Sequence, residues 1–147
     1  MIREATHDDI PAMVDLGRLM HDESPRFRGM AYDADKVSAC LEFCIDSADG
    51  FVRVAEEGGE IVGGFVAGVT PHYSSPSIIA CDIAVFMAPW ARGGFAVAKM
   101  AEQYRRWAEA RGAAQTMIGI MTGVNVEQTE RLLTRLGWRR AGVVMEA

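Results

Sequence analysis

Cysteine, histidine, basic charge and long apolar runs are all scarce in this sequence. Its three cysteines, Cys40, Cys44 and Cys81, are few and odd in number, which argues against the disulfide framework of a small secreted protein. The three histidines show no metal-ligand spacing, and Cys40 and Cys44 share an apolar helix face, so we predict no metal site. No apolar run approaches the roughly 18 to 20 residues that cross a bilayer, so we predict no membrane span.

The net charge, the first residues and two missing motifs exclude further classes of protein. The 15 basic and 20 acidic side chains give a net charge of −5, which disfavours nucleic-acid binding and favours small or cationic partners. Residues 1–4 enter a charged amphipathic stretch without the apolar block of a signal peptide, so we expect a cytoplasmic protein. The sequence lacks the Gly-Lys-Ser/Thr of a mononucleotide-binding loop and the third glycine of a dinucleotide-binding fingerprint. We therefore predict neither of these two nucleotide sites.

What the sequence does have is apolar material for one core, since 50% of its residues are hydrophobic. No composition shift or repeat divides it, so residues 1–147 should form a single domain. Helical spacing and apolar runs predict the elements, with the first helix capped by Thr6 and Asp9. We expect helices over 10–20, 37–45 and 92–111 and a fourth from a cap at Asn125 to Gly137, and strands over 2–5, 51–55, 61–70, 78–87, 115–122 and from Trp138 onward.

The order β-α-α-β-β-β-α-β-α-β predicts an α/β fold with a mixed, mostly antiparallel sheet. The Glu-Gly-Gly-Glu turn at 57–60 joins two of the strands as a hairpin. A right-handed strand-helix-strand crossover should run from Ile78 to Thr122. We expect the ligand site at this crossover.

The loop between the long strand and the third helix, residues 88–96, carries the chemistry that we expect there. Its small residues allow close approach of a ligand to the backbone, and the first N–H groups of the helix lack internal partners. Such a helix start attracts an anion, and Arg92 adds a bidentate donor suited to phosphate. A glycine-softened helix start with a solvent-facing arginine is the alternative interpretation.

This loop resembles the pyrophosphate-binding motif of the GCN5-related N-acetyltransferases, Arg/Gln-x-x-Gly-x-Gly/Ala. The family motif cradles acetyl-CoA, and the first position is Ala here rather than Arg or Gln. The resemblance implies acetyl-CoA as cosubstrate. The matching residues, which the resemblance implies as cosubstrate ligands, are Ala91, Arg92, Gly93, Gly94, Phe95 and Ala96.

The resemblance extends over nearly the whole chain, through the helix pair, the hairpin and the Arg-Leu-Gly-Trp of 135–138, which is similar to the family's Lys-Leu-Gly-Phe. Residues 21–25 and 122–125 resemble a subgroup of small, uncharacterised phage and bacterial members. In the family the central strand separates from its neighbour before the loop, and its main chain binds the pantetheine arm. The resemblance gives Val85 and Met87 that role.

Fewer residues are candidates for catalysis than for binding the cosubstrate. Asp82, on the apolar central strand, is a candidate general base, directly or through water, with a structural carboxylate as the alternative. The family's usual acid, a tyrosine, corresponds to Leu133. Tyr73 is a possible substitute or simply an exposed turn residue, and Tyr104 is assigned to the core. Asn125 lies one residue before a frequent CoA-contacting asparagine of the family, and we favour a helix cap over a ligand contact.

Two functions follow from these residues. One is an acetyl-CoA-dependent N-acetyltransferase in which a primary amine attacks the thioester directly. The other is a catalytically idle acyl-CoA-binding module with a regulatory or assembly role, suggested by Leu133 and Ala91. In the first, we expect the amine to enter between two segments, one carrying Phe27, Arg28 and Tyr32 and the other His72 and Tyr73.

The end of the chain predicts assembly. Residues 139–147 supply one strand, bent at Gly142, where many relatives have two. This strand would leave an apolar sheet edge of Val143, Val144 and Met145. We therefore expect a symmetric homodimer that covers this edge.

Overall fold

The computed structural model describes all 147 residues and contains one five-stranded sheet with four helices. The sheet order is β1-β2-β3-β4-β5, and every neighbouring pair is antiparallel except β4 and β5, which are parallel. The mixed, mostly antiparallel α/β architecture and the β4-α3-β5 crossover are as predicted. The strands are β1 (Ile2–Glu4), β2 (Gly50–Glu57), β3 (Glu60–Pro71), β4 (Ile78–Met87) and β5 (Gln115–Met117), and the helices are α1 (Ile10–Glu23), α2 (Ala34–Asp46), α3 (Ala96–Ala110) and α4 (Val126–Arg135), with short 3₁₀ turns at His7–Asp9 and Pro89–Ala91.

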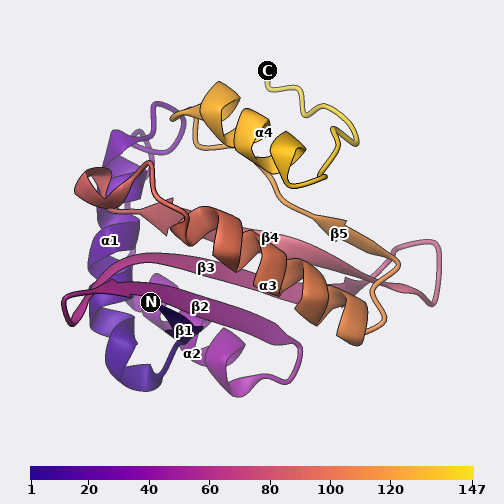
Figure 1. Cartoon of the computed structure of the whole chain (residues 1–147), viewed down its shortest axis with the longest axis horizontal. Coiled ribbons are helices and arrows are strands. Elements are labelled where there is room, and N and C mark those ends of the chain that lie inside the picture. Colours follow the sequence, from indigo (N-terminus) through magenta and orange to yellow (C-terminus); the bar gives the residue numbers. More distant parts are fainter.

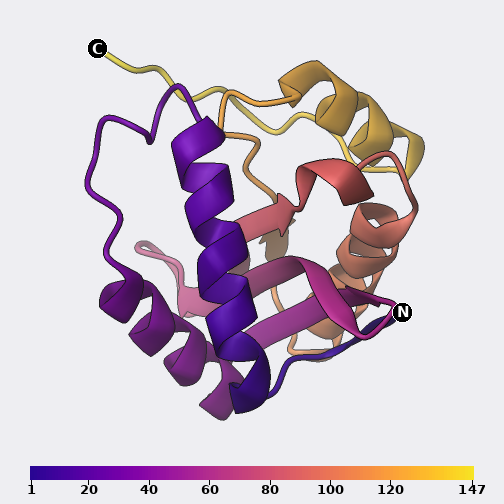
Figure 2. The same cartoon turned by 90° about the vertical axis from the view of Figure 1, so that its left-hand side faces the viewer.

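The sheet lies between two layers of helices (Figures 1 and 2). Helices α1 and α2 cover one face, and α3 covers the other with α4 beside it. Side chains alternate between the two faces along a strand, so Phe51 and Phe65 pack in the α3 core while Val52 and Val66 pack in the α1/α2 core. This double burial explains the nearly continuous apolar runs of the inner strands.

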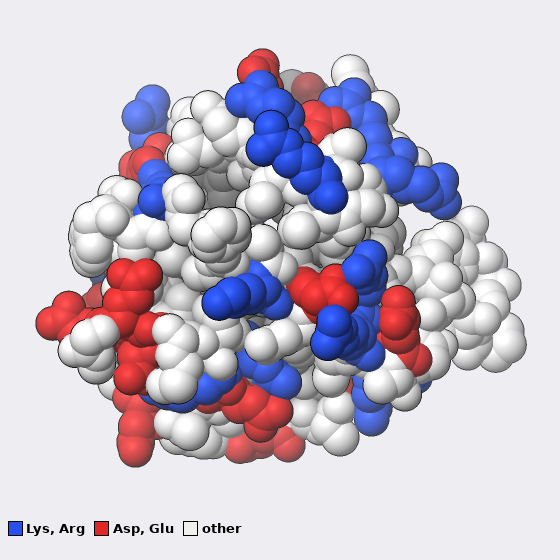
Figure 3. Space-filling model, in the orientation of Figure 1, with Lys and Arg blue, Asp and Glu red and all other residues white.

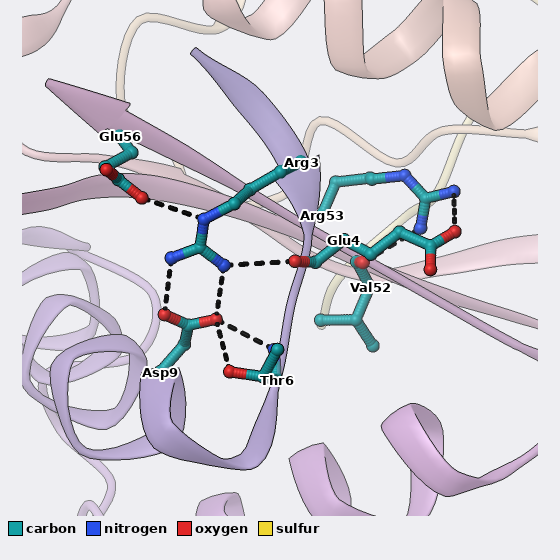
Figure 4. A network of polar contacts seen from close by, with 7 residues as sticks. All are labelled: Arg3, Glu4, Thr6, Asp9, Val52, Arg53 and Glu56. Atoms are coloured by element: carbon teal, nitrogen blue, oxygen red, sulfur yellow. Dashed lines mark hydrogen bonds and ion pairs between the residues drawn. The ribbon is translucent and has the colours of Figure 1, made fainter.

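Polar contacts close the N-terminal edge of the sheet (Figure 4). The Arg3 guanidinium donates to both carboxylate oxygens of Asp9, at 2.7 and 2.8 Å, and to Glu56 at 2.8 Å. Asp9 also accepts the main-chain N–H of Thr6 at 2.8 Å, which confirms the predicted capping pair. Arg3 lowers the pKa of the buried Asp9 carboxyl, mainly through these hydrogen bonds. One arginine thereby fastens β1, β2 and the start of the first helical segment together.

Two element boundaries at the crossover differ from the prediction. Helix α3 begins at Ala96 rather than Arg92, because Arg92 is extended and Gly93 has a φ of +87°. Strand β5 ends at Met117 rather than Thr122, where the chain leaves β4.

The last predicted strand does not form, so the expected apolar sheet edge at the C-terminal end is wrong. Residues 138–147 have no regular secondary structure, and side-chain ion pairs of Arg26 with Glu146 and Arg140 with Glu130 hold them. A strand there has only the three-residue β5 as a possible neighbour. Val143, Val144 and Met145 are instead 80%, 69% and 87% exposed in an irregular tail.

None of the helices is long and apolar enough to cross a membrane. No group of three or more His, Cys, Asp or Glu residues is arranged to hold a metal ion.

Candidate functional site

Strands β4 and β5 pair over only three residues and then separate. The parallel pairing covers Ile79 to Cys81 of β4, so the remainder of β4 up to Met87 has no strand partner on its β5 side. A β-bulge lies at the point of separation, since Ala84 pairs with Val66 and Asp82 with Ala67, leaving Ile83 unpaired. Bulges bend a strand and increase its twist. The result is an open stretch of strand edge in the middle of the fold.

The main chain of Val85 and Met87 faces this open edge. The N–H of Ala88 donates to Val62 on β3 at 2.8 Å, which fixes the alternation of hydrogen-bonded pairs along the antiparallel ladder. Val85 and Met87 then fall on the non-hydrogen-bonded positions, and their N–H and C=O groups point away from β3. An extended ligand can therefore bind here as an added strand.

A cavity of about 450 Å³ lies beside this edge. Figure 3 shows a hollow, walled mainly by uncharged side chains, where the start of α3 faces α4. Most of the residues predicted to hold the cosubstrate meet in its wall, although they come from three separate segments. The predicted residues that line it are Val85, Met87, Ala91, Arg92, Gly93, Gly94, Ala96 and Asn125. Phe95 is not among them and is 79% exposed.

The loop at 92–96 has the form of an anion site. The first N–H groups of α3, which begins at Ala96, have no carbonyl partner within the helix. A Cβ atom built on Gly93 or Gly94 meets no atom within 4 Å, so the space in front of this main chain is empty. Partial positive charge at a helix start, with open access to the backbone, suits a phosphate group.

Arg92 is paired, contrary to the expectation of a free phosphate donor. Its two terminal nitrogens donate to the two carboxylate oxygens of Glu23, at 2.7 and 2.5 Å, and its Nε donates to the carbonyl of Met87 at 3.3 Å. Hydrogen bonding to Arg92 lowers the pKa of Glu23. Glu23 also lines the cavity. No local pattern indicates this pair, because its partners are 69 positions apart.

Asp82 lies at the point where the strands separate. One of its carboxylate oxygens accepts the N–H of Gly119 at 2.7 Å, which ties β4 to the chain that follows β5. Burial raises the pKa of Asp82, although this hydrogen bond opposes the shift. Both interpretations of Asp82 stay compatible with this geometry, because the second oxygen is free to act on a bound group.

A second cavity, of about 720 Å³, adjoins the first. It lies under the C-terminal tail, and Cys81 and Asp82 form part of its wall. Both cavities are lined by Gly119 and Leu133, so they meet at the separated ends of β4 and β5. Leu133 is buried there and offers no proton donor.

Asn125 is the N-cap residue of α4, but the predicted side-chain cap is wrong. Its side chain makes no capping hydrogen bond, and the residue has a left-handed φ of +50°. Its carbonyl accepts the N–H and hydroxyl of Thr129 instead. The amide side chain is therefore unpaired at the wall of the first cavity.

The expected amine entrance does not form. Phe27, Arg28 and Tyr32 lie on the α1–α2 loop, whereas His72 and Tyr73 lie on the β3–β4 turn at the opposite end of the sheet (Figure 1). The hydroxyl of Tyr32 donates to the carbonyl of Val14, so this ring packs on α1.

Neither remaining tyrosine stands ready as an acid. Tyr73 is 95% exposed and lies one strand length, roughly 30 Å, from the loop at 92–96. Tyr104 is fully buried in the α3 core, as predicted, and its hydroxyl donates to the carbonyl of Met117.

A different part of the α1–α2 loop reaches the site. The Ser24 hydroxyl donates to the carbonyl of Thr122 at 2.5 Å, and Arg26 donates to the carbonyl of Met121 at 2.5 Å. These bonds fasten the end of α1 to the segment that joins β5 to α4. Arg26 also lines the second cavity.

The chain matches no protein-family model and no curated protein. It is similar over its whole length to solved structures. A transcriptional regulator from Bacillus halodurans C-125 has a TM-score of 0.77 at 21% identity, covering 100% of this chain and 97% of that one. An aminoglycoside 6'-N-acetyltransferase, AAC(6')-IG from Acinetobacter haemolyticus, has a TM-score of 0.75 at 10% identity, covering 100% and 96%. AAC(6')-Iy in complex with a CoA bisubstrate analogue has a TM-score of 0.78 at 15% identity, covering 100% and 95%. At these identities the likeness concerns the fold.

Proposed function

Because this chain has the fold of the GCN5-related N-acetyltransferases, we propose that it is an acetyl-CoA-dependent N-acetyltransferase. The observation that carries the proposal is the unpaired edge of β4, which runs directly into the open main chain of residues 92–96. A strand edge followed by an anion site matches an extended pantetheine arm followed by a pyrophosphate. The CoA analogue bound to one structural neighbour supports a cosubstrate of this type.

Each part of acetyl-CoA has a complementary feature. The pyrophosphate suits the N–H groups of 92–96, and the amides of pantetheine suit the main chain of Val85 and Met87. Asn125 lines the same cavity, and its side chain, which makes no capping hydrogen bond, would add a polar contact. The acetyl thioester would then lie near the separated strands, close to Asp82 and Gly119.

The reaction needs a neutral amine and a leaving thiol. The nitrogen lone pair attacks the thioester carbonyl carbon, the C–S bond breaks, and the products are an amide and CoA thiol. Asp82 is our candidate for taking the ammonium proton, directly or through water, because its raised pKa brings it closer to the pH at which a base is effective. Leu133 cannot protonate the thiolate and Tyr73 lies at the far turn, so water is the proton source that we propose.

The acceptor is proposed to be a small-molecule amine that enters through the second cavity. This cavity meets the first at Gly119 and Leu133, and Asp82 lies in its wall. Aminoglycoside acetyltransferases are among the structural neighbours, which is consistent with an acceptor of this class. A net charge of −5 favours a cationic acceptor through long-range attraction. A cytoplasmic location and a homodimer are also proposed. The sheet edge that first suggested the dimer does not form, so the dimer would instead cover the exposed Val143, Val144 and Met145 of the tail.

An acyl-CoA-binding module without turnover is the second candidate. The absence of an acid at Leu133 favours it. The two functions are separated by measuring thiol release from acetyl-CoA across a panel of amines that includes polyamines, aminoglycosides and amino acids. We expect amine-dependent thiol release with at least one of them. CoA binding without release for any amine would contradict the enzyme and favour the module.

A further inference from the structure

The Glu23–Arg92 pair occupies the anion site that we assign to the cosubstrate. Arg92 lies in the loop that precedes α3, and Glu23 is the last residue of α1. Each carboxylate oxygen of Glu23 accepts from one terminal nitrogen of Arg92, so Glu23 occupies the bidentate donor pair of the guanidinium. The same fork binds the oxygens of phosphate groups in the same bidentate way.

Arg92 also occupies part of the strand edge. Its Nε donates to the carbonyl of Met87, one of the main-chain acceptors that faces away from β3. In this arrangement the guanidinium of Arg92 is unavailable to a phosphate, because it binds Glu23. The carbonyl of Met87 is unavailable to pantetheine, because it accepts from Arg92. Both groups become available when Arg92 leaves Glu23.

The end of α1 is held firmly enough for Glu23 to stay in this position. The next residue, Ser24, is fully buried, and its hydroxyl donates to the carbonyl of Thr122. The carboxylate is therefore presented to the loop by a fixed backbone. Its charge also lies at the cavity wall, where it repels an incoming phosphate.

We propose that Glu23 is an internal competitor for the cosubstrate's pyrophosphate, which lowers the affinity for CoA by holding Arg92 in a closed arrangement. The proposal rests on the function proposed above. It assigns to Glu23 a role in setting cosubstrate affinity, and it makes the strength of CoA binding depend on the exchange of one anion for another at Arg92.

The test measures the dissociation constant of CoA by calorimetry for the wild type and for Glu23→Gln. We expect CoA to bind about three- to fivefold more tightly to Glu23→Gln, the size expected for releasing a partly exposed ion pair. The matched control is Asp22→Asn, which removes the same charge from the neighbouring residue. Asp22 is exposed and forms no ion pair, so less than a twofold change is expected.

Arg92→Ala supplies the second control. In that background the gain from Glu23→Gln should fall below twofold, because the competitor has lost the group for which it competes. Melting curves without ligand identify any loss of folding in these variants.

Each other outcome overturns the proposal. Equal tightening in Glu23→Gln and Asp22→Asn would indicate a general charge effect, and a gain that persists in Arg92→Ala would indicate the same. Weaker binding in Glu23→Gln would make Glu23 a support for Arg92 rather than its competitor. If neither the wild type nor Glu23→Gln binds CoA, the proposed function fails as well, whereas a wild type that binds CoA with no tighter Glu23→Gln removes this inference alone.

Discussion

Two parts of the sheet differ in how their main-chain groups find hydrogen-bond partners. One is formed by β1, β2 and β3 and is called the paired side below, and the other is formed by β4 and β5 and is called the open side. Strands β2 and β3 pair along the whole of β2, and the short β1 pairs with β2 over three residues at the outer edge, which the Arg3–Asp9–Glu56 contacts close. From β4 to β5 the pairing stops after three residues, and two cavities lie beside the unpaired edge. An unpaired edge inside a fold is costly unless a ligand or water satisfies it. The paired side therefore maintains the fold, and the open side is suited to a ligand.

The largest expected effect concerns the open side. Gly94→Val places a branched side chain in front of the main chain at which the pyrophosphate is expected, so the increase in melting temperature caused by acetyl-CoA should disappear. The ligand-free melting temperature should hardly change, because a Cβ at this position meets no atom and the backbone is not left-handed.

The control is Gly29→Val, at an equally open glycine on the α1–α2 loop, which should keep the full ligand shift. Normal CoA binding by Gly94→Val would move the pyrophosphate elsewhere. It would also mean that the open side does not bind the cosubstrate at the start of α3.

The next effect concerns catalysis at the separation point. Asp82→Asn keeps an oxygen to accept the N–H of Gly119 but cannot take a proton, so kcat/KM should fall about 10²-fold with CoA affinity unchanged. In the wild type, kcat/KM should decrease as the pH falls through the raised pKa of Asp82, and this step should be missing in the variant. A loss of less than threefold would make Asp82 a structural carboxylate.

A smaller effect is expected for stability on the paired side. Asp9→Ala leaves Arg3 and the Thr6 N–H without their partner and should cost about 2 kcal/mol, or roughly 5–8 °C in Tm. Because the folded pKa of Asp9 is lowered, its stabilisation is full above the unfolded value and disappears as the pH falls through the folded value.

The difference in Tm between wild type and Asp9→Ala should therefore shrink in strong acid. Asp8→Ala, at an exposed neighbour without an ion pair, is the control and should change Tm little. A difference that stays constant down to the lowest pH would show that the charge of Asp9 is not what stabilises this edge.

The smallest effect returns to the open side. Leu133→Tyr introduces a hydroxyl where the resemblance predicts the acid, and turnover should rise a few-fold if loss of the unprotonated thiolate limits the rate. Stopped-flow and steady-state thiol release measure it. An unchanged rate in a variant of normal Tm would assign the proton to another donor.

The sequence predicted the paired side better than the open side, for a physical reason. Helix α1, the Thr6–Asp9 capping pair of the 3₁₀ turn that leads into it, and the hairpin of β2 and β3 depend on local periodicity and turn residues, and the sequence predicts them nearly in full. The length of β5 and the absence of a strand in residues 138–147 depend on which strand edges of the sheet are available for pairing. Pairing between distant segments is not encoded in local pattern.

The candidate site divides in the same way. The loop at 92–96 and the edge positions Val85 and Met87 follow from a contiguous motif and its register, and the structure brings them to one cavity. Glu23, which holds Arg92, is far away in sequence and carries no pattern of its own. The amine entrance was misassigned because the β3–β4 turn and the α1–α2 loop leave opposite ends of the sheet, a consequence of topology rather than of residue type.

A structure of the protein with CoA bound would show whether the unpaired edge of β4 holds the cosubstrate. We predict that the pyrophosphate lies on the main chain of residues 92–96, that the pantetheine arm hydrogen-bonds Val85 and Met87, and that the thiol points to the gap between β4 and β5. CoA bound away from this edge, with β4 still unoccupied, would contradict it.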